Sequence, residues 1–191
     1  MKKPGNTKLP STDEELKALA AKEKGKYTYA VNDYFAKPKS SSFQLSPNGT
    51  FMSYREKDEN LKKHVYVKNI KSGEVKRVIE EKEELIRGYG WANDSRLVYV
   101  MDKGGNEDYH LFAVDIDGKN QKELTPYKGV KVNILEMLKE DKDHMIISMN
   151  KNNAEVFDPY KINIKNGEIE QLYENKDICL LYTSDAADEH S

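Results

Sequence analysis

The sequence predicts an all-β fold built from a repeated unit of four short strands. Its apolar runs are short, rich in Val, Ile, Tyr and Phe, and partly alternate with polar residues, which is typical of half-buried strands. Gly follows Ser, Asp or Asn between the last two runs of each unit, and such pairs favour tight hairpin turns. No helical periodicity of useful length occurs between residues 43 and 178, which argues against an α/β alternation.

The unit recurs at a nearly constant spacing. His64 lies 46 residues before His110, and Gly73 lies 45 residues before Gly118. The third copy is weaker, but its Gly167 follows Gly118 by 49 residues. This period is typical of β-propeller blades, each of which is a four-stranded antiparallel meander. We therefore expect an incomplete β-propeller of about three four-stranded antiparallel meander blades.

A short N-terminal helix is predicted before the repeat. Ser11 and Glu14 have the spacing of a capping box, and the apolar residues that follow indicate a helix over about residues 12–24. We assign residues 1–42 to this helix and a lead-in, and residues 43–178 to the partial propeller. The expected blades are about 43–80, 88–127 and 132–174.

Large aromatic side chains are expected to fill the layers between stacked blades. We assign this packing role to Phe51, Trp91, Tyr99 and Phe112. A ring closes with about 4–8 blades, so three blades leave an apolar inter-blade face uncovered. The charge run at residues 80–84 predicts a solvent-exposed segment between the first two blades.

Composition excludes several function classes. The 31 Lys and Arg balance 33 Asp and Glu, so no nucleic-acid partner is predicted. No apolar run approaches the roughly 20 residues that a membrane span needs. No secretory signal is readable after Met1, and a cytoplasmic location is the default expectation. The single cysteine, Cys179, excludes a disulfide within this chain and any cysteine-based zinc site.

Five segments together resemble the propeller of the prolyl oligopeptidase family of serine peptidases. Residues 46–49 (SPNG) resemble the family's "SPDG" blade signature, and residues 91–96 (WANDSR) resemble a diverged copy of it. Residues 124–126 (LTP) resemble the close of a blade. Residues 33–38 (DYFAKP) resemble the approach to the propeller, and residues 153–160 (NAEVFDPY) a form found in bacterial members.

The resemblance covers about residues 27–178 and implies a function for the parent protein. In this family the propeller precedes and gates an α/β-hydrolase domain that cleaves short peptides without a cofactor. The hydrolase nucleophile lies in a Gly-x-Ser-x-Gly motif, which this sequence does not contain. We therefore assign no catalytic, cofactor-binding or metal-binding residue, and expect the chain itself to be inactive. Its expected partners are its own hydrolase domain and a short peptide. A non-catalytic binding or scaffold propeller remains the alternative.

Other polar residues could bind a metal or a peptide, but each also has a purely structural interpretation. His64 and His110 could converge on a metal, but they also fit as recurring strand-start residues. Residues 115–118 (DIDG) resemble half of a calcium loop, yet a hairpin turn explains them. Glu59 and Glu107 could bind a peptide amino terminus, but they align with no such motif, and a solvated loop is the preferred interpretation.

Residues 179–191 break the repeat and are expected to be a non-native tail. From Cys179 to about Glu189 they resemble a translated transposase adapter of the kind used in preparing shotgun DNA libraries. The tail also contains the residue types of a catalytic triad, which are Ser184, Asp185, Asp188 and His190. True triads are assembled from distant segments on a rigid fold, so no catalytic role is assigned there.

Overall fold

The computed structural model describes residues 12–22, 38–102 and 104–176. It divides into two units, residues 1–38 and residues 39–191, which are described separately. Among the described residues, no helix has the length and apolarity needed to cross a lipid bilayer.

The first unit contains one helix, α1 (Asp13–Lys22). The Oγ1 atom of Thr12 accepts a hydrogen bond from the backbone N–H of Glu15 at 3.2 Å, so Thr12 caps the helix. Thr12 and Glu15 have the spacing of a capping box, one residue beyond the predicted pair. The predicted cap Ser11 lies outside the described residues.

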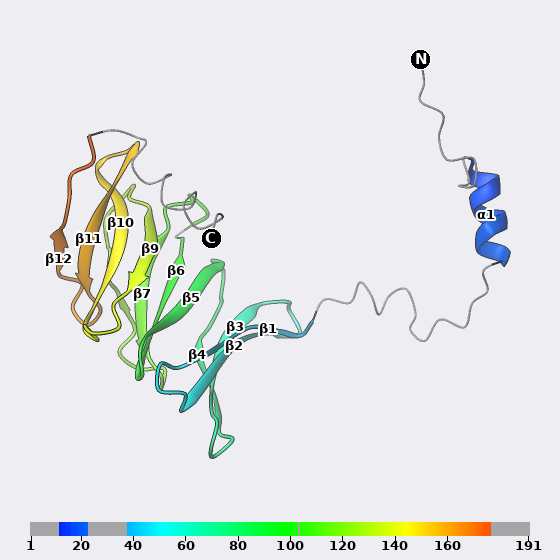
Figure 1. The fold of residues 1–191 in the computed structure, drawn as a ribbon, viewed down its shortest axis with the longest axis horizontal. Helices are drawn as coiled ribbons and strands as arrows, with labels where there is room; N and C mark the ends of the chain where they lie inside the picture. The colour runs from blue at the N-terminus through cyan, green and yellow to red at the C-terminus, as the bar shows by residue number, and fades with distance from the viewer. Residues whose placement is uncertain (1–11, 23–37, 103, 177–191) are drawn as a thin grey trace, which may run out of the picture. The chain divides into compact units, whose positions relative to one another are not determined.

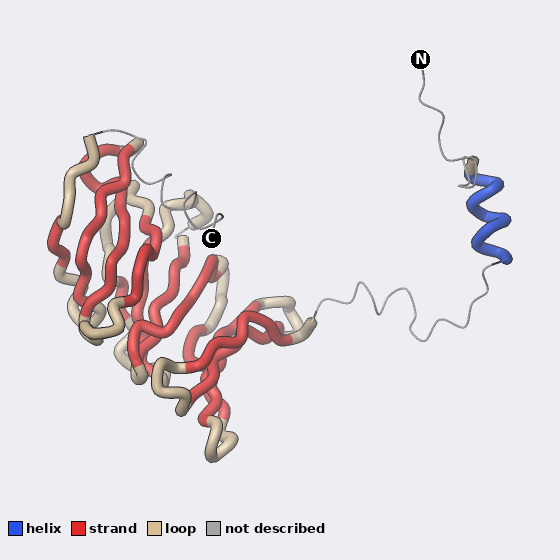
Figure 2. Tube along the Cα trace, in the orientation of Figure 1, coloured by secondary structure: helices blue, strands red, loops and turns tan. Residues whose placement is uncertain are grey.

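The second unit confirms the predicted all-β fold. Three four-stranded antiparallel sheets follow one another along the chain, and each has its strands in sequence order, as a meander requires (Figures 1 and 2). Blade 1 consists of β1 (Ser40–Leu45), β2 (Phe51–Lys57), β3 (Lys63–Asn69) and β4 (Val75–Ile79). Blade 2 consists of β5 (Ile86–Asn93), β6 (Arg96–Met101), β7 (His110–Asp115) and β8 (Lys122–Glu123). Blade 3 consists of β9 (Val132–Met137), β10 (His144–Asn153), β11 (Val156–Asn163) and β12 (Ile169–Gln171).

Blade 2 is buried on both faces, because blades 1 and 3 pack against it. Successive side chains of a strand point to opposite faces, so Leu97 and Tyr99 contact blade 1 while Val98 and Val100 contact blade 3. This double burial explains why β6 is a continuous apolar run from Leu97 to Met101.

The interface between blades 1 and 2 combines stacked aromatic rings with aliphatic side chains, and the interface between blades 2 and 3 is mainly aliphatic. At the first, Tyr99 stacks on Phe112 with ring centroids 5.2 Å apart, and Phe51 stacks on Trp91 at 6.5 Å. These four aromatic residues pack in this layer among aliphatic side chains, which confirms their predicted packing role. The second interface buries these side chains of blade 3: Val132, Met145, Ile147, Met149, Tyr160, Ile162 and Ile164.

The face of blade 1 that points away from blade 2 stays exposed, as expected for an open array. Tyr54 pairs with Tyr66 at the register position where Tyr99 pairs with Phe112 in blade 2. Phe43 stacks on Tyr54 with ring centroids 5.5 Å apart and is 58% exposed. Blade 1 therefore has an aromatic face that no described blade covers, whereas the equivalent face of blade 2 is covered by blade 1.

Candidate functional site

The first strands of the three blades lie next to one another and form what we call the inner row, β1, β5 and β9. The side-chain amide of Gln44 in β1 donates a hydrogen bond to the carbonyl of Tyr89 in β5, at 3.1 Å. Between the second and third strands of the row, Gly90 of β5 lies near Met137 of β9. A methyl group added at Gly90 would lie 3.6 Å from the terminal carbon of Met137.

Gln44 and Gly90 occupy the same place in successive blades. Gln44 pairs with Ser53 in its sheet, and Gly90 pairs with Val98, which is the corresponding residue of the second strand. At the first interface the Gln44 side chain fills the gap between inner strands. At the second interface Gly90 has no side chain to do so.

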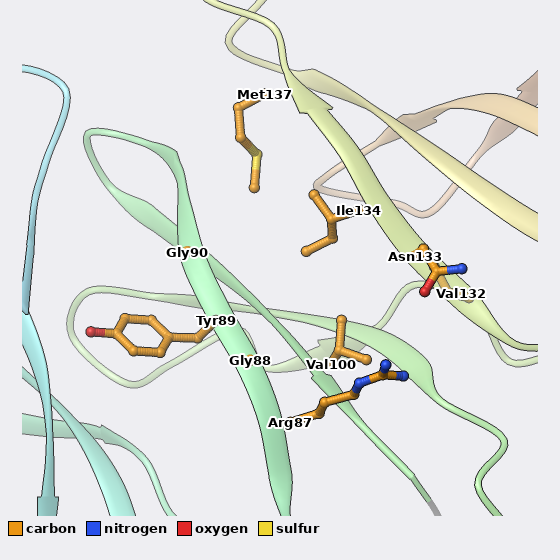
Figure 3. Close-up of a pocket in the computed structure, with 9 residues that line it drawn as sticks. All are labelled: Arg87, Gly88, Tyr89, Gly90, Val100, Val132, Asn133, Ile134 and Met137. Carbon is orange, nitrogen blue, oxygen red and sulfur yellow. The ribbon is translucent and has the colours of Figure 1, made fainter. Parts of the chain in front are cut away.

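A pocket of about 460 Å³ opens at this second interface (Figure 3). It lies between β5 and β9, and Gly88 and Gly90 leave its blade 2 side without side chains at two positions. A methyl group added at Gly88 would have no atom within 4 Å, which shows how open this side is. The apolar side chains of the wall are Val100, Val132, Ile134 and Met137.

Two polar side chains, Arg87 and Asn133, stand at one side of this pocket (Figure 3). The guanidinium of Arg87 lies over the ring of Tyr109, 4.5 Å from the ring centroid. This cation–π contact fixes one face of the guanidinium and leaves its N–H groups at the edge available for hydrogen bonds. Tyr89 points to the other side of β5, where its hydroxyl donates to the carbonyl of Ser42 and burial raises the pKa of its phenol.

A buried ion pair clamps the first interface. Glu81 is buried, and its carboxylate accepts hydrogen bonds from Arg55 Nη2 at 3.2 Å and from the backbone N–H groups of Lys63 and Ile86. Arg55 also donates to the carbonyl of Ile86, at 2.6 Å. The prediction of a solvent-exposed charge run at residues 80–84 is therefore wrong at Glu81. The charged partner of Glu81, Arg55, lies 26 residues earlier, so no local charge pattern could have marked it.

A second charged clamp joins blades 2 and 3. Arg96 is buried, pairs with the carboxylate of Asp115 in its own blade, and donates through Nε to the carbonyl of Ile164 in blade 3, at 2.8 Å. Its Nη2 reaches the carbonyl of Asn120 at 3.2 Å. Its Nε, Nη1 and Nη2 groups thus each bind an acceptor within the fold.

The turns after the first strands are linked from blade to blade. The backbone N–H of Asn48 donates to Asp94 Oδ1 at 2.8 Å, and the other carboxylate oxygen of Asp94 pairs with Lys142 Nζ at 3.2 Å. Asn93 adds a hydrogen bond to the Lys142 carbonyl, at 2.8 Å. Asn48, Asp94 and Lys142 follow one another by 46 and 48 residues, so one repeat position supplies the whole chain of contacts, which we call the rim chain.

The structure places the two repeat histidines in separate local contacts. The backbone N–H of Glu81 donates to His64 Nδ1 at 3.1 Å, so Nε2 carries the ring proton and faces Asp58 Oδ2 at 3.3 Å. His110 instead contacts the carboxylate of Glu123 through Nδ1. Across residues 12–22, 38–102 and 104–176, no three His, Cys, Asp or Glu side chains converge as a metal site would require.

The remaining sequence candidates fall in turns and loops. Gly118 has a φ of +78°, which a tight turn after β7 requires, while Asp115 is held by Arg96. Glu59 and Glu107 are both exposed. Cys179 and the triad-like residues of the tail lie outside the described residues.

Sequence reasoning missed the pocket and its polar side chains. Arg87 and Asn133 are 46 residues apart, close to the repeat period, but only the stacking of blades brings their strands together. The signal available was the Gly-Tyr-Gly of residues 88–90 within a predicted strand, since Gly in a strand often marks a close backbone approach.

The sequence comparisons point to peptidases. No protein-family model matches the chain. Dipeptidyl aminopeptidase BIII of Pseudoxanthomonas mexicana is 25% identical over 178 residues, a match that takes in 93% of this chain and 26% of that protein. The chain therefore spans about a quarter of the length of the curated relative it matches.

The structural comparisons agree with the sequence match. An acylaminoacyl peptidase from Pyrococcus horikoshii superposes with a TM-score of 0.53 at 21% identity, over 72% of this chain and 26% of that one. The β-propeller domain of the Trilobed protease from Pyrococcus furiosus gives 0.50 at 16% identity, over 72% and 44%. The chain is a partial β-propeller similar to those of peptidases. For this propeller, the solved structures establish the fold, and the sequence match carries the relation to peptidases.

Proposed function

We propose that this propeller is the substrate-gating part of a serine peptidase that acts on short peptides. Its partner is an α/β-hydrolase domain of the same polypeptide. The observation that carries the proposal is the 178-residue match to a dipeptidyl aminopeptidase, of which the chain spans only 26%. The chain contains no Gly-x-Ser-x-Gly motif, so the nucleophile is supplied by sequence other than these residues.

The packing of the blades supports a gating role. A gate that admits peptides by size must hold its walls in place while chains pass. The clamp at Glu81, the clamp at Arg96 and the rim chain each tie one blade to the next through named hydrogen bonds. In the inner row, the Gln44 amide holds β1 against β5.

A fluorophosphonate probe tests the proposal on the longer polypeptide encoded at the same locus. We expect it to label one serine within a Gly-x-Ser-x-Gly motif, and the labelled protein to lose hydrolysis of short peptides. The 191-residue chain alone is expected not to be labelled. A reading frame with further blades and no such motif would contradict the proposal and favour the non-catalytic binding or scaffold propeller.

A further inference from the structure

We infer that the pocket between β5 and β9 binds the C-terminal residue of a short peptide, with its carboxylate at Arg87 and an aliphatic side chain in the pocket. This inference rests on the proposed peptidase function, because it names the chemistry of a peptide held at the inner row. It concerns binding, and it assigns no catalytic role to these residues.

The apolar part of the pocket fits one aliphatic side chain and the adjoining backbone. A volume of about 460 Å³ lies within the range of about 300–1,000 Å³ that small-molecule sites occupy. Val100 and Val132 are buried, while Ile134 and Met137 are partly exposed and would lose water contact on binding. Because Gly88 and Gly90 carry no side chains, a peptide backbone can approach β5 closely.

Arg87 supplies the charge that selects a carboxylate. The sequence has four arginines, and the three others each pair with a carboxylate: Arg55 with Glu81, Arg77 with Glu80 and Arg96 with Asp115. Within the described part of the chain, Arg87 has no ion-pair partner, and its guanidinium lies over the Tyr109 ring. A planar guanidinium held on one face by an aromatic ring suits bidentate binding of a carboxylate.

Asn133 can bind the peptide group next to the carboxylate that Arg87 binds. Asn133 lines the same pocket from β9, at the side where Arg87 of β5 lies, and its exposed side chain makes no hydrogen bond with any residue the structure describes. An amide side chain offers both a donor and an acceptor, which is what the peptide group next to a C-terminal residue requires. A single cation beside an apolar wall favours this ligand over a phosphate, since a phosphate brings more charge and no apolar group.

Calorimetry on the 191-residue chain tests the inference with N-acetyl-Ala-Ala-Leu and its C-terminal amide. We expect the free carboxylate to bind at millimolar or lower concentration and the amide to bind about tenfold to a hundredfold more weakly. Arg87→Gln should weaken binding of the carboxylate by a similar factor and leave binding of the amide unchanged. Gly90→Gln, which supplies the side chain that Gln44 supplies at the first interface, should abolish binding of both.

Arg77→Gln is the matched control, because it removes an equal charge from an arginine of β4 that lies outside the pocket. Equal binding of carboxylate and amide would overturn the inference, as would equal weakening by Arg77→Gln and Arg87→Gln or unchanged binding after Gly90→Gln. Absence of any heat with the carboxylate would overturn it too. This measurement involves no catalytic domain, so such a failure stays distinct from a failure of serine labelling in the longer polypeptide.

Discussion

The two inter-blade interfaces solve the same packing problem with different residues. The first contains stacked aromatic rings, is tied at the inner row by Gln44, and contains the Glu81–Arg55 pair. The second is mainly aliphatic, is clamped by Arg96, and has Gly90 where the first has Gln44. One interface is therefore filled at the inner row and the other is hollow. A repeated fold thus acquires a pocket by omitting a side chain at one copy of a repeat position.

The largest expected effect breaks the first interface at its buried ion pair. Glu81→Ala removes the acceptor of three donors and leaves the Arg55 guanidinium, whose side chain is only 13% exposed, without its carboxylate. We expect the free energy of unfolding to fall by about 3–5 kcal/mol, measured by urea denaturation. Glu83→Ala, in the same segment but exposed, should change it by less than about 0.5 kcal/mol. Equal effects of the two substitutions would contradict the clamp.

Alkaline pH should weaken the interface between blades 1 and 2 through the Tyr99 phenol. Burial raises the pKa of the Tyr99 phenol to about 12, above about 10 for an unfolded chain. The unfolded state therefore loses this proton first, and stability falls by about 1.4 kcal/mol per pH unit between pH 10 and 12. Below pH 10 this contribution is fully present. Tyr99→Phe should show a shallower decline over that window, and parallel curves for the two proteins would refute this origin.

The smallest expected effects come from substitutions at the equivalent positions Gln44 and Gly90 of the inner row. Gln44→Ala removes the hydrogen bond to the Tyr89 carbonyl and should cost about 0.5–1.5 kcal/mol. Gly90→Ala, at the equivalent place, should stabilise by about 0.4–1 kcal/mol, because it restricts the unfolded chain and its methyl group meets Met137 at ordinary contact distance. Thermal melts of both variants measure the pair. Two changes of the same sign would show that the interfaces do not differ at this position.

Local patterns in the sequence were sufficient to predict the blades. Hairpin turns at Gly73, Gly118 and Gly167 all have positive φ, which is the backbone property that their sequence neighbours favour. The strand alternation and the repeat spacing also placed the aromatic residues of the first interface correctly, because a repeat position fixes the face to which a side chain points.

The candidate site could not be predicted in the same way. The pocket depends on how far β5 lies from β9, which is a property of blade stacking rather than of either strand. Glu81 was predicted to be exposed because its sequence neighbours are charged, but its carboxylate is buried in an ion pair with Arg55, 26 residues earlier. Where a partner lies on another segment and outside the repeat spacing, the sequence carries no local sign of it.

The rim chain has a consequence for the identity of the blades. At one repeat position Asn48 offers a backbone donor, Asp94 accepts from both neighbours, and Lys142 offers a cation. Exchanging blades 1 and 2 would set an asparagine beside the lysine of blade 3, and duplicating blade 3 would set two lysines side by side. Like charges so placed repel each other. The three blades are thus not interchangeable copies, because the rim-chain residue of each blade complements only the residues of the blades beside it.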